Sequence, residues 1–349
     1  MVPEGNWPED GLERLGKCPA CGAAARAEMF AALRDEAFHA APGRWPLWRC
    51  LDCEAAYIDP RPDAASIGLA YAGYYTHAEP GSAVSARRKR MRVRLQLGYY
   101  NKRYGYDFAA GWGVGALVYR FNPMKALRAD YAIRHLPAPP PAGGTLLDVG
   151  CGNGSFLLTA RDLGYVATGL EPDEDAVRRA RAAGLDVRLG VLPESGLQEN
   201  SFDHVCLNHV FEHLHKPREA AREILRLLRP GGRVWLSQPN LGAIGLQVFG
   251  ASWRGLEAPR HLSLYTHGSL MRLLCEAGFT DVEMLPAEAA ADFYFQQSLS
   301  MRQGLNPQKT RTPPGWNAKW RKQVRAANEM ARRMPERGES LTMVARKPG

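Results

Sequence analysis

The sequence predicts an α/β fold in which a doubly wound, mostly parallel sheet of seven strands carries helices on both faces. Three observations predict it. From residue 145 onward, apolar segments alternate with amphipathic ones, as in parallel strands joined by crossover helices. A glycine-rich turn joins the first apolar segment to the first amphipathic one. A run rich in proline and glycine at 137–144 ends the preceding element, so we expect the main domain to begin near residue 143.

The individual strands and helices follow from periodicity. Short, continuous apolar runs predict strands that are buried on both faces. These strands are expected at 145–149, 165–171, 185–189, 202–207, 233–237, 280–285 and 341–345. Amphipathic helices are expected at 155–163, 174–183, 217–228 and 268–277. Gly164, Gly184 and Gly278 follow three of these helices and favour the left-handed backbone that ends a helix.

Four of the seven cysteines form two closely spaced pairs. The pairs are Cys18 with Cys21 and Cys50 with Cys53, and 28 residues separate them. Each pair can present two thiolates from one tight turn, and four thiolates make a tetrahedral shell that suits zinc. Such a shell has no open position. The sequence therefore predicts a structural Zn²⁺ site in a small zinc-ribbon module.

The length of 349 residues accommodates a full α/β domain and smaller parts. We expect three parts: the zinc-binding module at 1–62, a helical linker or lid at 63–142, and the main domain at 143–349. Residues 286–340 fit the strand and helix alternation poorly, so we expect a long insertion there that packs over the active site.

The glycine-rich turn predicts a ligand site. Gly150, Gly152 and Gly154 permit a tight turn and let a ligand lie against the backbone. The turn lacks the Gly-Lys-Ser/Thr ending of a loop that cradles a nucleoside triphosphate. Glu171 follows at the end of the next expected strand, where a carboxylate can accept both hydroxyls of a ribose. An adenosine-containing ligand is therefore expected.

Several motifs in order resemble the class I S-adenosylmethionine-dependent methyltransferases over about residues 143–285. They are the loop Asp148–Ser155, the acid Glu171, the "sFDvV"-like strand at 201–205, the following segment at 208–214, and the "LkPGG"-like turn at 228–232. The resemblance implies a Rossmann-like methyltransferase fold, S-adenosylmethionine as the methyl donor, and a methyltransferase activity.

The resemblance also implies which residues bind this cofactor. Gly150 and Asn153 would contact the methionine part or the ribose, and Gly190 with Val191 would lie beside the adenine. Asn208 and His209 would flank the sulfonium. The complete expected set is Asp148, Gly150, Gly152, Asn153, Gly154, Glu171, Pro172, Gly190, Val191, Asn208 and His209. The spacing of His209, Glu212 and His213 would also suit a metal, although a helix start with capping and packing roles is the favoured interpretation.

The expected general base is His261. Methyl transfer to a hydroxyl requires alignment of the acceptor and removal of its proton, and histidine has a pKa near working pH. The segment Pro259–Thr266 resembles "H-L-S-x-F/Y-T/S" of zinc-containing sugar methyltransferases, whose matching histidine is the base. The alternative is that His261 caps a helix or packs against Trp253.

The expected acceptor is a small molecule, for example a hydroxyl of a sugar or secondary metabolite, and an anionic molecule or a glycan is compatible. The residues expected to bind it are Tyr75, Trp253, Arg260 and Tyr265. Arg260 would clamp a phosphate or carboxylate, and a plain salt bridge is the alternative. Oxygen is expected as the methylated atom ahead of carbon or nitrogen.

The net charge of +9 favours anionic partners. The alternative function is therefore an RNA methyltransferase that uses the zinc ribbon and basic helices for binding, although no known RNA-binding module is present. The basic stretch from Arg87 to Arg94, followed by 108–121, also permits peripheral contact with an anionic membrane. No secretory signal is visible at the N-terminus, so a cytoplasmic location with reduced thiols is expected.

Overall fold

The computed structural model describes residues 3–71, 86–286 and 288–349. By their contacts the residues group into two compact units. Unit 1 comprises 1–74, 190–201 and 207–349, and unit 2 comprises 75–189 and 202–206. The expected division at residues 62 and 142 stays a prediction.

Among the described residues, seven strands form one sheet, and its order confirms the expected fold. The order is β12 (Thr280–Met284), β13 (Ser340–Arg346), β10 (Leu228–Pro239), β9 (Phe202–Asn208), β6 (Gly144–Val149), β7 (Tyr165–Glu171) and β8 (Asp186–Leu189). β6, β7 and β8 pair in parallel, whereas β13 runs antiparallel to both β10 and β12. Every expected strand is present, and β10 is longer at both ends than the expected 233–237.

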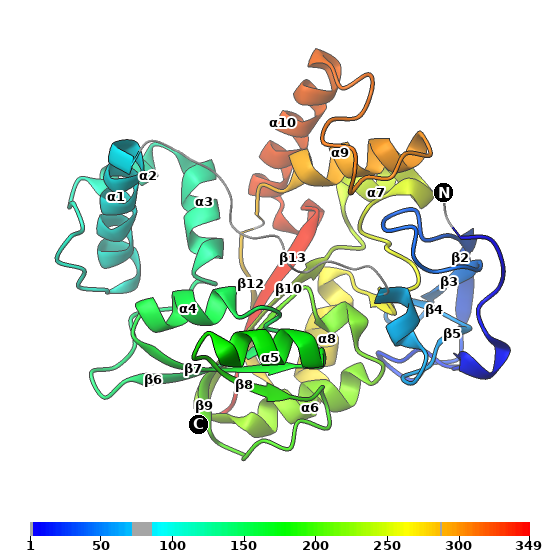
Figure 1. Cartoon of the computed structure of the whole chain (residues 1–349), viewed down its shortest axis with the longest axis horizontal. Helices are drawn as coiled ribbons and strands as arrows, with labels where there is room; N and C mark the ends of the chain where they lie inside the picture. The colour runs from blue at the N-terminus through cyan, green and yellow to red at the C-terminus, as the bar shows by residue number, and fades with distance from the viewer. Residues whose placement is uncertain (1–2, 72–85, 287) are drawn as a thin grey trace. The chain divides into compact units, whose positions relative to one another are not determined.

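In its described residues, unit 2 contains β6–β8, most of β9 and the helices α1–α5. α4 (Ser155–Asp162) and α5 (Glu174–Ala182) pack on these strands, as Figure 1 shows. Their apolar sides enclose a small core with Leu157, Val177 and Leu185. The segment before the sheet forms α1 (Ala86–Tyr104), α2 (Gly115–Arg120) and α3 (Pro123–Ala132). The expected helical linker or lid at 63–142 stays a prediction.

Close packing within this helical part depends on glycine. A Cβ atom at Gly98 would lie 1.8 Å from the carbonyl oxygen of Trp112. A Cβ atom at Gly115 would lie 2.0 Å from the carbonyl oxygen of Leu95. Only glycine lets the backbones of α1 and the α2 segment approach this closely.

Unit 1 contains a second, antiparallel sheet built largely by the N-terminal segment. Its strands lie in the order β11 (Ser263–Leu264), β4 (Ala56–Ile58), β3 (Trp45–Cys50) and β2 (Arg26–Leu33). β1 (Leu12–Glu13) pairs separately with β5 (Arg61–Pro62). The pairing of β11 with β4 joins residues far apart in the sequence, and no sequence pattern predicts it.

The helices of unit 1 fall into two groups. α6 (Pro217–Leu227) and α8 (His267–Ala277) pack against each other. α7 (Ile244–Phe249), α9 (Ala291–Arg302) and α10 (Ala318–Arg333) lie side by side (Figure 1). They share a core with the N-terminal segment that includes Trp7, Trp45 and Trp253. The short 3-10 helices are η1 (Glu9–Gly11), η2 (Ile67–Tyr71), η3 (Phe211–His213), η4 (Gly250–Ser252) and η5 (Pro335–Arg337).

In the part of 286–340 that the structure describes, α9 and α10 complete this core. Their expected position over the active site stays a prediction. None of the helices in the described part of the chain combines the length and apolar character needed to cross a bilayer.

Candidate active site

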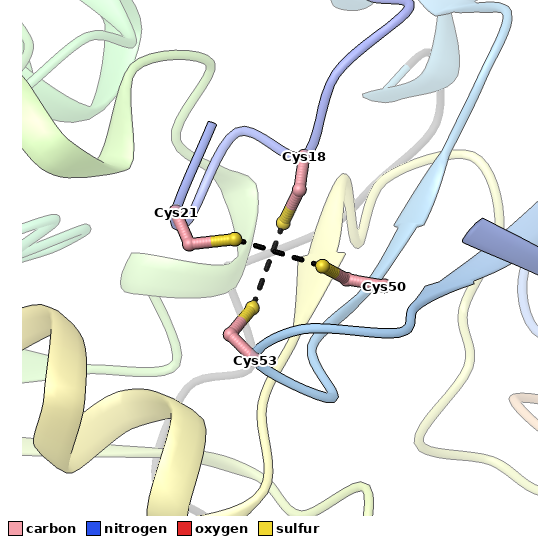
Figure 2. Close-up of side chains that lie close together, drawn as sticks. All are labelled: Cys18, Cys21, Cys50 and Cys53. Carbon is pink, nitrogen blue, oxygen red and sulfur yellow. Dashed lines mark hydrogen bonds between the residues drawn. The ribbon is translucent and has the colours of Figure 1, made fainter. Parts of the chain in front are cut away.

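The four cysteines converge on one point in unit 1, as Figure 2 shows. The Sγ atoms of Cys18 and Cys53 lie 3.7 Å apart, and those of Cys21 and Cys50 lie 3.6 Å apart. A tetrahedral zinc with Zn–S bonds of about 2.3 Å places its sulfurs about 3.8 Å from each other. The residues present therefore fit Zn²⁺ bound by four thiolates.

The local backbone explains this convergence. The Gly22 amide donates to the Cys18 carbonyl, and the Glu54 amide donates to the Cys50 carbonyl, at 2.8 and 3.1 Å. Gly22 and Glu54 both have positive φ angles, of 84° and 65°, which turn the chain back toward the sulfurs. Burial, together with the neighbouring Cys53 and Cys50, raises the pKa of Cys21 to about 12. Uncharged thiols crowded together in this way are the expected state of such a cluster without a cation.

The glycine-rich turn in unit 2 has the backbone that ligand binding requires. Gly150, Gly152 and Gly154 all have positive φ angles, between 54° and 79°. A Cβ atom at Gly152 would meet no atom within 4 Å, so the backbone is open on that side. A Cβ atom at Gly154 would lie 2.3 Å from Cδ1 of Leu185, so this glycine is needed for packing of α4 against the sheet.

The structure brings Glu171 to this turn. Its Oε2 accepts a hydrogen bond from the Gly152 amide at 2.8 Å, and its Oε1 accepts one from the Asp173 amide at 3.1 Å. Burial raises the pKa of Glu171, although these two bonds partly offset the increase. The side chain is fixed at the end of β7, next to Pro172, with further lone pairs for ribose hydroxyls.

Asp148 lies buried below the turn at the end of β6 and pairs with Arg134. Burial raises the pKa of Asp148, and the positive charge of Arg134 counteracts this effect. Among the described residues, Asp148 Oδ2 has no hydrogen-bond partner. A buried carboxylate oxygen without a partner suits the ammonium group of an amino-acid ligand. These features fit S-adenosylmethionine. Asn153 caps the start of α4 locally by accepting from the Ser155 amide at 3.1 Å.

The other expected cofactor residues, Gly190, Val191, Asn208 and His209, belong to unit 1. His209 has a positive φ of 54°, an uncommon conformation for a residue with a side chain. Its Nδ1 lies 3.2 Å from Oε1 of Glu212. Burial lowers the pKa of His209, but the hydrogen bond and charge of Glu212 outweigh this and leave the pKa raised.

His261 lies in a buried polar centre of unit 1. Its Nδ1 lies 2.8 Å from the carbonyl oxygen of Gly255. Since a carbonyl oxygen can only accept, Nδ1 is the donor of this hydrogen bond. Its Nε2 lies 3.5 Å from Oε2 of Glu257 and 3.9 Å from Oε1 of Glu212. The ring of His213 packs edge-on against it, with centroids 4.8 Å apart. The imidazole therefore presents Nε2 to two carboxylates.

Burial lowers the pKa of His261 to about 4, although Glu257 and Glu212 act in the opposite direction. Burial raises the pKa of Glu257, but the charges of Arg254, His261 and Arg260 outweigh it and hold the pKa well below its usual range. Glu212 also has a lowered pKa, because its three histidine neighbours outweigh the effect of burial. At neutral pH the centre thus holds two carboxylates and a neutral imidazole.

Arg260 is completely buried beside His261. It forms a salt bridge with Asp35 from the segment between β2 and β3, in which Nη1 and Oδ2 are 3.1 Å apart. Nη1 also donates to the Ala70 carbonyl at 2.7 Å, and Nε donates to Glu257 at 3.1 Å. The ring of Phe38 covers the guanidinium, with 4.3 Å from Cζ to the ring centroid. These contacts fix the turn that carries His261.

Two of the other expected substrate residues are also buried. Trp253 stacks on Tyr294 and donates from Nε1 to Glu339 at 2.8 Å. Tyr265 is fully buried, and among the described residues its hydroxyl has no hydrogen-bond partner. Tyr75 lies outside the described residues.

Asp35 and Glu257 are the parts of this centre that sequence reasoning missed. Glu257 precedes Arg260 and His261 by three and four residues, a spacing that would have indicated a local contact in a turn. No sequence signal links Asp35 to Arg260, because 225 positions separate them.

The comparisons with known proteins agree with this geometry. Residues 119–284 match the family model described as a methyltransferase domain. Together with the strand order and the glycine-rich turn after β6, the match defines the class: this stretch is a class I S-adenosylmethionine-dependent methyltransferase domain. The resemblance found in the sequence is confirmed.

Two of the curated relatives are named as methyltransferases. The chain is 34% identical over 151 residues to a ubiquinone biosynthesis O-methyltransferase of Xanthomonas oryzae pv. oryzae, a match that covers 40% of this chain and 62% of that protein. It is 37% identical over 124 residues to an uncharacterized methyltransferase of Mycobacterium tuberculosis, covering 34% of this chain and 46% of that protein. The chain therefore spans less than two thirds of the length of these relatives.

Solved structures with some likeness include two S-adenosylmethionine-dependent methyltransferases. The one from Archaeoglobus fulgidus has a TM-score of 0.43 at 19% identity and covers 65% of this chain and 94% of that one. The one from Mesorhizobium loti has a TM-score of 0.41 at 22% identity and covers 64% of this chain and 96% of that one.

Proposed function

We propose that the chain transfers the methyl group of S-adenosylmethionine to a hydroxyl of a small molecule, with His261 as the general base. The observation that carries this proposal is the fixed tautomer of His261. Its Nδ1 proton is committed to the Gly255 carbonyl, so the lone pair of a neutral ring is on Nε2 and free to take a proton.

A general base and a rigid binding site are sufficient to catalyse methyl transfer to a hydroxyl. When bound, S-adenosylmethionine supplies a methyl group on a positively charged sulfur, which is a good leaving group. The open backbone at Gly152 and the fixed carboxylate of Glu171 would hold the adenosine, and Asp148 would accept from the ammonium group. His261 Nε2 would remove the proton of the hydroxyl as the oxygen attacks the methyl carbon.

The assignments outside unit 2 are part of the same proposal. Gly190 and Val191 would lie beside the adenine, and Asn208 with His209 would flank the sulfonium. Tyr265, Trp253, Arg260 and Tyr75 would shape the acceptor site. For Arg260 the contacts support positioning of His261, because Asp35, Glu257 and the Ala70 carbonyl engage its guanidinium.

The similarity to a ubiquinone biosynthesis O-methyltransferase supports an oxygen acceptor on a small molecule. A dihydroxybenzoate is a suitable first probe, because a phenolic hydroxyl loses its proton more easily than a sugar hydroxyl. A nucleotide sugar is the second probe, since the net charge of +9 favours an anionic acceptor.

The test is His261→Ala, assayed by release of S-adenosylhomocysteine with each probe. We expect turnover to fall ~100-fold or more, the usual contribution of a general base, while calorimetry shows unchanged cofactor affinity. His267→Ala, at the first turn of α8, is the matched control and should keep full activity. Unchanged turnover in His261→Ala would remove His261 from the mechanism.

Peripheral contact with an anionic membrane is a further part of the proposal. In unit 2, Phe121 is 78% exposed, and Leu117 and Val114 are each more than half exposed, near the basic helix α1. Exposed apolar side chains beside arginines suit an anionic lipid surface. Co-sedimentation with vesicles containing phosphatidylglycerol, but not with neutral vesicles, would support this contact.

The alternative of RNA methylation has less support. Asp35 and β4 of the zinc-binding module contact other residues of unit 1, so these parts of the module have a structural role that does not require RNA. Retention of the chain on RNA that weakens steeply with salt would favour this alternative, and no affinity at low salt would exclude it.

A further inference from the structure

A second cluster of side chains of the kinds that bind metals lies in unit 1, apart from the four cysteines. Glu212, His213 and His261 each present a ligand atom, and these atoms lie within 4.8 Å of one another. Glu212 and His213 come from η3, and His261 comes from the turn that precedes β11. The spacing in the sequence had grouped Glu212 and His213 with His209, whereas the fold places His261 beside them.

Both histidines have the same fixed tautomer. His261 Nδ1 lies 2.8 Å from the Gly255 carbonyl. His213 Nδ1 lies 2.9 Å from the Arg260 carbonyl and 3.0 Å from the hydroxyl of Tyr71, which can accept as well as donate. Since a carbonyl oxygen can only accept, each Nδ1 carries a proton, and in the neutral ring Nε2 has the lone pair. A histidine that binds a metal typically donates its other nitrogen to a carbonyl or carboxylate in this way.

The carboxylate of Glu212 is completely buried and incompletely paired. Oε1 lies 3.2 Å from Nδ1 of His209. Among the described residues, Oε2 has no hydrogen-bond partner, although its side chain is 0% exposed. A buried carboxylate oxygen without a partner is costly, and a bound cation is one way to satisfy it.

The two carboxylates near Nε2 of His261 would also be stabilised by a bound cation. Its Nε2 lone pair faces Glu212 Oε1 at 3.9 Å and Glu257 Oε2 at 3.5 Å. Glu257 is neutralised by Arg254 and Arg260. Glu212 has no arginine or lysine among the partners the structure shows for it, and its polar neighbours are histidines.

We propose that Glu212, His213 and His261 bind a divalent transition-metal ion through one carboxylate and the Nε2 atoms of two histidines. Two histidines and one glutamate are a known ligand set of zinc sites that keep an open position. Imidazole ligands suit Zn²⁺, Fe²⁺ or Co²⁺, whereas Mg²⁺ and Ca²⁺ prefer oxygen ligands. This centre differs from the cysteine site, which is closed and structural.

The consequence for catalysis rests on the proposed function, whereas the binding claim does not. Nε2 of His261 cannot bind a cation and accept a proton at the same time. In the loaded protein His261 therefore could not act as the general base, so the methyl transfer proposed above belongs to the protein without this ion.

The test measures metal binding by the full chain without any cofactor. Protein that holds one zinc in the cysteine site, verified by elemental analysis, is titrated with Zn²⁺ in a calorimeter and with Co²⁺ in a spectrophotometer. We expect one further equivalent, and the added Co²⁺ should show visible bands of a nitrogen and oxygen site without thiolate charge transfer. Glu212→Gln and His261→Gln should weaken this binding by ~100-fold or more.

His267→Gln is the control and should bind the second metal as the unaltered chain does. Retention of the first zinc and an unchanged melting temperature in Glu212→Gln and His261→Gln show that these variants are folded. If either variant unfolds, Glu212→Asp, which keeps the charge and shortens the side chain, should bind more weakly but measurably. A chain that binds only the cysteine-site metal overturns the proposal, and so does equal binding by Glu212→Gln. Failure of S-adenosylmethionine to bind would affect the proposed function alone.

Discussion

The buried imidazole of His261 sets the expected pH dependence of activity. Burial lowers the pKa of His261 to about 4, against the raising effect of Glu257 and Glu212. The ring is then a free base at every pH well above this value, so the acid limb of kcat/KM should lie near pH 4 rather than near 6.5. Initial rates between pH 5 and 9 test this. A limb centred near 6.5 that disappears in His261→Gln would show that His261 titrates near its ordinary pKa, which contradicts the lowered value.

The buried carboxyl group of Glu339 should make the stability of the folded chain depend on pH. Burial raises the pKa of Glu339 from 4.5 to about 7, although bonds from Trp253 and the Gly245 amide act in the opposite direction. Between these values the unfolded chain releases this proton more readily than the folded chain does, so the free energy of unfolding falls as pH rises from 4.5 to 7. The loss amounts to about 3 kcal/mol.

Urea unfolding of the chain and of Glu339→Gln between pH 4.5 and 8 measures this effect. Glutamine keeps the shape and cannot ionise, so the variant should lose less stability across the window. Parallel curves for the two proteins would show that Glu339 does not titrate there.

The roles of individual residues could be predicted only in part from the sequence. The cysteines, the glycines and Glu171 occur in patterns whose spacing follows from their chemistry, so their local geometry was predictable. Asp35 was not, because a salt bridge between a ribbon loop and Arg260 depends on how two distant segments pack.

At the scale of elements, the zinc-binding module supports the turn that carries His261. β4 pairs with β11, which begins two residues after His261, and the Ile58 amide donates to the Leu262 carbonyl at 3.1 Å. Asp35 holds Arg260 on the other side of His261. Zinc at the cysteines would therefore keep the base in place even though it does not touch the reaction.

Loss of the zinc should thus reduce both stability and activity. Cys21→Ser removes one of four ligands, and we expect loss of the metal by elemental analysis, a lower melting temperature, and destabilisation on the order of several kcal/mol. Cys275→Ser, on the exposed side of α8, is the control and should change neither property. A zinc-free variant with full turnover would contradict the supporting role of the module.

The glycine-rich turn makes a prediction of its own. Gly152→Val forces a branched side chain into a backbone with φ of 54° and places atoms on the open side of the turn. We expect cofactor affinity to fall at least tenfold, roughly 1.4 kcal/mol. Gly184→Val, with φ of 76° and equally open space, carries the same backbone strain away from the site. Equal loss of affinity in both variants would show that strain alone is responsible.

At the scale of the whole molecule, the strands and helices of the main sheet were predictable, because short apolar runs alternate with amphipathic segments. The second sheet was not, since its strands are short and β11 joins it from a position about 200 residues away in the sequence. The two helices within 286–340 were only partly predictable, because α9 has apolar residues on several sides and packs in a core shared with distant segments.

Calorimetry tests the central claim most directly: that the turn at Gly150–Gly154 and the carboxylate of Glu171 bind the methyl donor. Full-length, zinc-loaded protein is titrated with S-adenosylmethionine and with S-adenosylhomocysteine. We predict one binding event per chain for each, and a large loss of affinity in Glu171→Ala, since the ribose hydroxyls lose their acceptor. Absence of heat with both ligands, or equal affinity in Glu171→Ala, would contradict the account.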